Sequence, residues 1–152
     1  MSPKKILVPI DFSEHSQKAL EWALFLAAPT GTPLILFHII PRPPTEWLTR
    51  MVAEEKRLEA ELRADAEKRL QEIAVGKTIP IETMVFWGGD PTSEICVLAE
   101  RQGVDLIVMG THGKTGLKRM LIGSVAERVI RHAPCSVLAI RAPHEEQAGE
   151  GA

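Results

Sequence analysis

Residues 4–13 read Lys-Lys-Ile-Leu-Val-Pro-Ile-Asp-Phe-Ser, and this stretch decides the class of fold. The apolar run within residues 4–10 shows no alternation with polar positions, which is typical of a strand buried on both faces of a parallel sheet. The run stops at Asp11, and Ser13 can cap a helix because its hydroxyl can accept a hydrogen bond from a free amide of the first turn. The stretch therefore predicts a central strand followed directly by a helix.

The rest of the chain repeats this alternation of strand and helix. Further strands are predicted over residues 33–40, 80–87, 104–109 and 135–141. Helices are predicted after Ser13 and over residues 45–75, 92–102 and 117–132, and the charges of 45–75 indicate a solvated helix face. The pattern predicts one α/β domain with a doubly wound, five-stranded parallel sheet, whose ligands bind beyond the carboxyl ends of the strands.

Composition limits the classes of partner. The chain has 152 residues, 18 Lys and Arg against 20 Asp and Glu, and a net charge of -2 without a basic stripe. This balance argues against a nucleic-acid or membrane-surface binder, because phosphate-dominated binding needs clustered cations. The two cysteines, Cys96 and Cys135, are too few for a disulfide framework or a zinc site built on cysteines. With no signal-like or membrane-spanning run at the N-terminus, we expect a cytoplasmic protein.

A glycine-rich loop follows the strand predicted at 104–109. Gly110, Gly113 and Gly116 are spaced three apart, and Gly123-Ser124 lies farther on at a helix start. Backbone amides at such positions can approach an anion closely, which makes the loop a candidate phosphate cradle. Glycines here also serve tight turns or packing, and that alternative stays open. The loop has neither the Walker A spacing nor the Rossmann fingerprint, which weakens both of those readings.

The spacing Gly110-x2-Gly113-x9-Gly123-Ser124, together with residues 5–13, closely resembles the universal stress protein family over about residues 3–142. Within that family this glycine pattern marks the branch that binds ATP. The resemblance implies an adenine nucleotide alpha hydrolase-like (Rossmann-like) sheet of order 3-2-1-4-5 in a domain spanning 1–143. It also implies ATP as ligand, with Mg²⁺ bridging its phosphates. Residues 144–152 are expected to be a disordered tail.

The resemblance also assigns roles to individual residues. Around the nucleoside it places Pro9, Asp11, Ile39, Met109 and Gly110. Around the phosphates it places Gly113, Gly123, Ser124 and Val125, with Ser13, His112 and Lys114 as further candidates. Ser13 has an alternative role as a helix cap, and His112 and Lys114 have alternatives as solvated side chains. His38, in the strand at 33–40, is expected to be a satisfied core histidine rather than a ligand.

The expected function is that of an ATP-binding stress-response or signalling protein. No dedicated base is evident, because Asp11 is the one carboxylate near the expected pocket, so catalysis would be at most slow ATP hydrolysis. An adenylating enzyme is an alternative, disfavoured because the Ser-Gly-Gly-x-Asp-Ser loop of that class is absent after residue 10. An interaction module with a vestigial pocket is another. Family members dimerise through their last strand, so a homodimer through residues 135–141 is expected.

Overall fold

A single parallel sheet forms the centre of the protein. The computed structural model describes residues 2–42, 52–112 and 122–141. The strands are β1 (Ile6–Pro9), β2 (Leu34–Ile40), β3 (Ile81–Trp87), β4 (Leu106–Gly110) and β5 (Ser136–Ile140). They pair in parallel in the order β3-β2-β1-β4-β5. Both the predicted fold class and the order 3-2-1-4-5 are confirmed.

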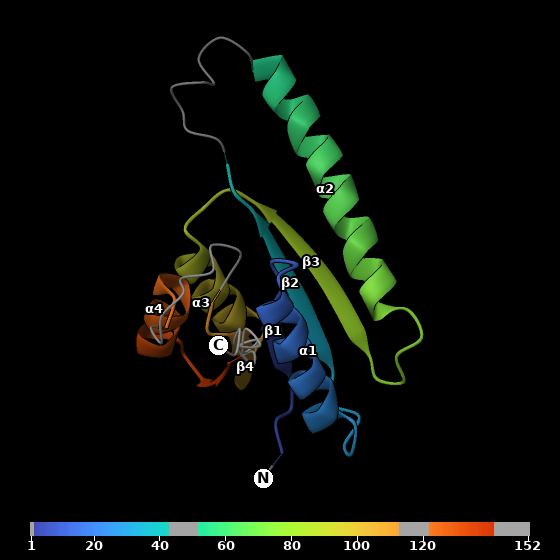
Figure 1. The fold of residues 1–152 in the computed structure, drawn as a ribbon, viewed down its shortest axis with the longest axis vertical. Coiled ribbons are helices and arrows are strands. Elements are labelled where there is room, and N and C mark those ends of the chain that lie inside the picture. Colours follow the sequence, from blue (N-terminus) through green and yellow to red (C-terminus); the bar gives the residue numbers. More distant parts are fainter. Residues whose placement is uncertain (1, 43–51, 113–121, 142–152) are drawn as a thin grey trace, which may run out of the picture.

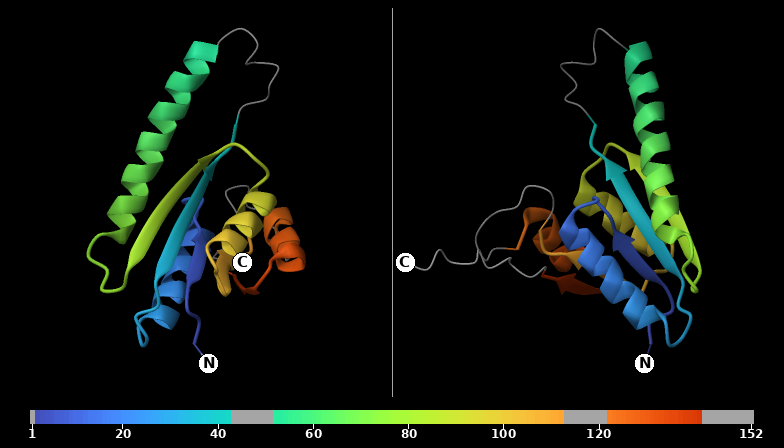
Figure 2. Two further views of the ribbon diagram at one scale, coloured as in Figure 1. Left: turned by 180° about the vertical axis from the view of Figure 1, so that it is seen from behind. Right: turned by 45° about the vertical axis from the view of Figure 1, so that its right-hand side comes forward.

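Helices cover both faces of this sheet (Figures 1 and 2). They are α1 (Glu14–Ala27), α2 (Val52–Ala74), α3 (Pro91–Arg101) and α4 (Ser124–His132). The alternation of side chains along β1 divides the core, because Ile6 and Val8 pack with α1 and α2 whereas Leu7 packs with α3 and α4. All three of these side chains are fully buried, as expected for a central strand. None of the helices in the described ranges is long and apolar enough to cross a membrane.

The fourth helix begins later than the sequence predicted. Ile122 and Gly123 are not helical, and α4 starts at Ser124, so the prediction of a helix from residue 117 is wrong at these two positions. The reason is non-local: the Gly123 amide donates to the Thr111 carbonyl at 2.6 Å, which ties the extended Gly123 to the end of β4. Residues 117–121, 45–51 and the tail at 144–152 lie outside the described residues.

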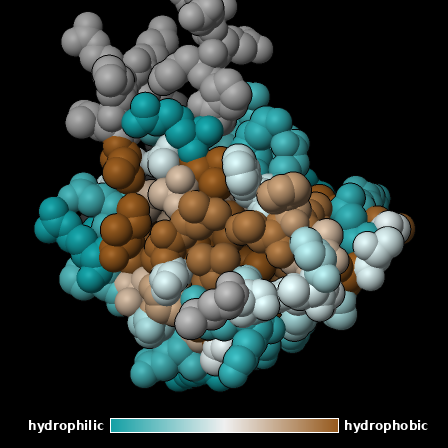
Figure 3. All heavy atoms as spheres, turned by 90° about the horizontal axis from the view of Figure 1, so that it is seen from below, coloured by the Kyte–Doolittle hydropathy of each residue, from teal (hydrophilic) through white to brown (hydrophobic). Residues whose placement is uncertain are grey.

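The edge strand β5 borders an apolar surface. β5 lies at the end of the sheet beyond β4, and Val137, Leu138 and Ala139 are partly exposed along it. Figure 3 shows apolar side chains gathered on the face seen from below Figure 1, the side on which β5 lies. The strand order of the described residues, in which β5 pairs only with β4, confirms the predicted edge position of the last strand.

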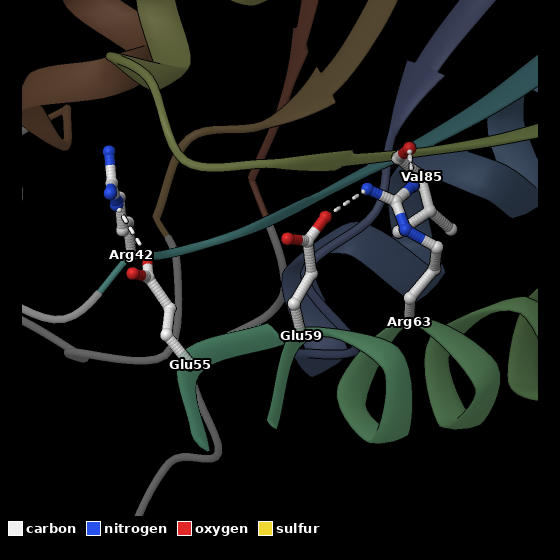
Figure 4. Close-up of polar contacts among 5 residues, drawn as sticks. All are labelled: Arg42, Glu55, Glu59, Arg63 and Val85. Carbon is white, nitrogen blue, oxygen red and sulfur yellow. Dashed lines mark hydrogen bonds and ion pairs between the residues drawn. The ribbon is translucent and has the colours of Figure 1, made fainter. Parts of the chain in front are cut away.

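Polar contacts fix the N-terminal half of α2 beside β2 and β3. Arg63 on α2 donates to the Val85 carbonyl of β3 at 2.8 Å and to Glu59 at 2.9 Å (Figure 4). One turn farther toward the start of α2, Glu55 accepts from Arg42, just beyond β2, at 2.9 Å. The charge run predicted to be a solvated face is thus mostly exposed, but two of its side chains, Arg63 and Glu55, also bind residues outside the helix.

Candidate functional site

A cavity of about 260 Å³ opens at the carboxyl edge of the sheet, beyond the ends of β1, β2 and β4. β1 lies between β2 and β4, and the helices that follow β1 and β4 cover opposite faces. This is the point where strand order reverses, which is where doubly wound sheets bind ligands. The described residues that line the cavity are Pro9, Ile10, Asp11, Ser16, Phe37, Ile39, Pro91, Ile95, Met109, Gly110, Thr111, His112, Gly123, Ser124, Val125 and Ala126.

The cavity brings most of the predicted site residues together. Those that line it are Pro9, Asp11, Ile39, Met109, Gly110, His112, Gly123, Ser124 and Val125. Ser13 is not among the lining residues, and Gly113 and Lys114 lie outside the described part of the chain. Sequence reasoning missed the wall contributed by Pro91 and Ile95 of α3, because no motif in that helix pointed to a site. It also missed Ser16 as a lining residue, because the sequence suggested for Ser16 only a second candidate cap of the helix after Ser13.

A short turn after β1 fixes the Asp11 carboxylate. The Ser13 amide donates to Asp11 Oδ1 at 2.9 Å, and the Ser13 hydroxyl donates to the same oxygen. Ser13 Oγ in turn accepts from the Ser16 amide at 3.2 Å, so its predicted role as the α1 cap is confirmed. Because Ser13 holds both Asp11 and the helix, the carboxylate has a defined position at the cavity.

The backbone of this turn is strained at Phe12. Its φ of 63° lies in the left-handed region that non-glycine residues rarely adopt. The Phe12 ring contacts two partners: the His38 ring, with centroids 4.6 Å apart, and the Arg69 guanidinium of α2, 3.7 Å from the ring centre. His38 Nδ1 is also 2.7 Å from the Ile10 carbonyl, which confirms the prediction of a satisfied core histidine. These contacts hold the turn in a conformation that its sequence disfavours.

The N-terminus of α4 borders the cavity without a side-chain cap. Its N-cap is Gly123, in extended conformation, and none of the residues that the structure describes caps the helix with a side-chain hydrogen bond. Ser124 and Val125 begin the first turn, and all three residues line the cavity. The free amides of a first helical turn and the positive end of the helix dipole attract anions. This end of the cavity is therefore suited to a negatively charged group.

Gly110 has a packing role. A Cβ atom at this position would lie 2.8 Å from His15 Cβ and 2.9 Å from the His15 carbonyl carbon and oxygen. Real Cβ atoms do not approach other atoms so closely, so the end of β4 and the start of α1 can meet only with glycine here. The packing alternative is thus confirmed for Gly110, which also lines the cavity.

A polar link joins α3 to α4 beside the site. Asp90 caps α3 by accepting from the Ser93 amide at 3.0 Å, and it pairs with both terminal nitrogens of Arg128 on α4, at 2.9 and 3.2 Å. The Ser93 amide, followed by the Arg128 guanidinium, holds the pKa of the Asp90 carboxyl below its usual value. The pair fixes the relative position of two helices that supply cavity walls.

The thiols of Cys96 and Cys135 lie in surroundings that disfavour the negatively charged form, unlike those of Asp90. Burial, and then neighbouring negative charge, raises the pKa of both the Cys96 and the Cys135 thiols. Both are free, and a raised pKa keeps them in the unreactive thiol form. The prediction that they are small packing residues agrees with this environment.

Comparison with known proteins gives consistent results. Residues 3–141 match the model of the universal stress protein family. Universal stress protein MJ0531 of Methanocaldococcus jannaschii is 36% identical over 148 residues, covering 94% of this chain and 85% of that protein. The solved structure of protein MJ0577 superposes with a TM-score of 0.79 at 33% identity, covering 93% of this chain and 97% of that one. A universal stress protein from Archaeoglobus fulgidus, solved in complex with dAMP, shares the fold with a TM-score of 0.63 at 23% identity, covering 92% and 99%.

Proposed function

The chain belongs to the universal stress protein family, and from that premise we propose that it binds ATP in the cavity at the carboxyl edge of the sheet. The nucleotide acts as a signal that changes the protein's interactions during stress. The observation that carries the proposal is the N-terminus of α4, whose first residues line the cavity and have no side-chain cap within the described part of the chain. The Archaeoglobus fulgidus protein solved in complex with dAMP supports the proposal at the level of the fold, because a protein of this fold binds an adenine nucleotide.

The proposed orientation follows the polarity of the walls. Pro9 and Ile39 supply an apolar surface suited to the adenine, and Asp11 supplies a fixed acceptor for ribose hydroxyls. Ser124 and Val125 then meet the phosphates through their amides. Gly113 and Lys114, which follow β4 in the sequence and lie outside the described residues, are also proposed as phosphate contacts.

Mg²⁺ fits this arrangement as a partner of the phosphates. Among the described residues, no group of three or more His, Cys, Asp or Glu side chains is placed to hold a metal ion. Mg²⁺ commonly binds through substrate phosphates and water with few protein ligands. When bound, the ion would neutralise part of the phosphate charge.

The titratable groups of the cavity favour ATP binding over rapid ATP hydrolysis. Asp11 is the one carboxylate among the described lining residues, and its Oδ1 already accepts from Ser13. A group free to orient an attacking water is therefore not evident in this part of the wall. Slow ATP hydrolysis is the second candidate, and Mg²⁺-dependent turnover that disappears in a Ser124 variant would favour it.

A negative charge introduced at the start of α4 tests the proposal. We expect Ser124→Glu to weaken ATP affinity roughly tenfold, about 1.4 kcal/mol, because a carboxylate there repels the phosphates. Adenosine affinity should change far less, since the substitution lies at the phosphate end. Ser2→Glu, exposed before β1 at the opposite edge of the sheet, is the matched control. Calorimetry that finds equal ATP affinity in both variants would refute the orientation.

Two further measurements test the ligand itself. Mass spectrometry of small molecules released from protein purified without added nucleotide should detect an adenine nucleotide. ATP with Mg²⁺ should also raise the unfolding temperature, because a ligand that binds only the folded state stabilises it. No thermal shift at millimolar ATP would instead favour an interaction module with a vestigial pocket.

We further propose that two copies associate in the cytoplasm by pairing their β5 strands. An apolar strand at the edge of a sheet leaves backbone groups unpaired, and a second strand can satisfy them. The apolar face that Figure 3 displays on the β5 side supports this pairing. Light scattering should give twice the chain mass at micromolar concentration, and a monomer mass would contradict the proposal.

A further inference from the structure

Two histidines from different elements meet behind the cavity. His15 lies in the first turn of α1 and His112 follows β4, and their ring centroids are 5.2 Å apart at an interplanar angle of 47°. His15 Nδ1 and His112 Nε2 are buried, and neither has a hydrogen-bond partner among the residues that the structure describes. Buried polar atoms nearly always have partners, so two orphaned imidazole nitrogens in contacting side chains require an explanation.

We propose that His15 and His112 together bind a divalent transition metal ion, for which Zn²⁺ is the representative. A zinc ion bound to two imidazole nitrogens at about 2.0–2.1 Å with a tetrahedral angle would hold the ring centres about 5.2 Å apart. The observed separation has this value. Imidazole nitrogen suits zinc, nickel and copper, whereas Mg²⁺ prefers oxygen ligands.

The surroundings of His112 resemble those of a metal ligand. Thr111 Oγ1 lies 2.9 Å from His112 Nδ1, and Thr111 is itself buried. Metal-binding histidines usually donate their second ring nitrogen to an oxygen acceptor, which fixes the tautomer and leaves the other nitrogen free to coordinate. In the tautomer whose Nδ1 donates to Thr111, His112 Nε2 carries the lone pair that a metal needs.

The two histidines are also held by rigid parts of the fold. The close approach of Gly110 to the Cβ and carbonyl of His15 locks the first turn of α1 against the end of β4, two residues before His112. A site on two packed elements needs little rearrangement to bind. Because His112 also lines the cavity, the remaining metal positions can be taken by water or by an oxygen of a bound ligand.

Zinc binding by the full-length chain, without a histidine tag or nucleotide, tests the proposal independently of ATP binding. The protein should carry Cys96→Ser and Cys135→Ser, so that thiols do not contribute. We expect one Zn²⁺ per chain, measured by competition with a chromogenic chelator, and no displacement by millimolar Mg²⁺. His15→Gln or His112→Gln should each weaken the affinity at least about tenfold, as removal of a metal ligand implies.

A matched variant and a spectroscopic readout separate ligation from folding. His132→Gln alters an exposed histidine at the end of α4 and should leave zinc affinity unchanged. Co²⁺ should give visible absorption bands of a tetrahedral site that disappear in the His15 and His112 variants, while thermal unfolding without metal verifies that these variants fold. The proposal is overturned if no stoichiometric zinc binds, if binding persists in the His15→Gln/His112→Gln double variant, or if His132→Gln weakens it equally.

Discussion

Replacing Gly110 with alanine tests whether close packing between β4 and α1 builds the site. The added Cβ would lie 2.8–2.9 Å from three atoms of His15, two of them in the backbone, so α1 or the end of β4 must move. Overpacking of this kind costs about 1–3 kcal/mol. With a urea m-value of about 2 kcal/mol per M, the unfolding midpoint should fall by roughly 0.5–1.5 M.

Two controls separate this clash from other effects of the substitution. Gly31→Ala places a Cβ in open space at a φ of 65°, so it should cost about 1–2 kcal/mol through backbone strain alone and leave ATP affinity unchanged. Gly110→Ala should weaken ATP binding as well, because Gly110 lines the cavity. In a His15→Ala background, which keeps the Cβ and the carbonyl, Gly110→Ala should cost as much as before. A neutral Gly110→Ala, or rescue by His15→Ala, would refute the reasoning.

The other predictions concern three separate supports of the fold. Asp90→Ala should cost about 1 kcal/mol as a lost helix cap. Because folding lowers the pKa of Asp90, its contribution to stability is present above the unfolded pKa of 3.8 and is lost as pH falls through the folded pKa. A stability difference between variant and wild type that is the same at pH 3 and pH 7 would contradict this. Phe12→Gly should be more stable than Phe12→Ala by about 1 kcal/mol, because a φ of 63° favours glycine, and the usual opposite order in urea unfolding would show that the turn relaxes. Leu70→Ala, at the fully buried side chain that joins α2 to the core, should cost about 2–5 kcal/mol, whereas Leu62→Ala, 39% exposed, should cost far less by the same assay.

Strands and most helices could be predicted because their signals are local. The apolar run that becomes β1 indicates a strand by itself, and the proline after β2 marks the end of that strand without reference to distant residues. Strand order has no such local signal, because it depends on which elements pack together far along the chain. The order 3-2-1-4-5 came from family resemblance, and so did the grouping of Asp11, Ile39 and Ser124 into one site.

The differences from prediction arise where distant segments meet. The α4 boundary is set by the hydrogen bond from Gly123 to Thr111, which no periodicity within residues 117–132 could reveal. The His15–His112 contact joins residues 97 positions apart, 15 to 112, and neither has a neighbour in sequence that suggests the other. The α3 wall of the cavity is likewise brought to the site by packing rather than by a motif.

The helix N-termini explain how a chain with a net charge of -2 can offer a place to a polyanion. Where the structure describes both a helix start and its cap, α1 is capped by the Ser13 side chain and α3 by Asp90, so one amide in each first turn already has a side-chain acceptor. The N-cap of α4 is instead Gly123, which has no side chain to offer, and Gly123, Ser124 and Val125 all line the cavity. A helix start left uncapped in this way keeps its amides and its positive dipole end for an external acceptor. The attraction for phosphate therefore comes from backbone amides at the start of one helix, and the net charge of the chain gives no indication of it.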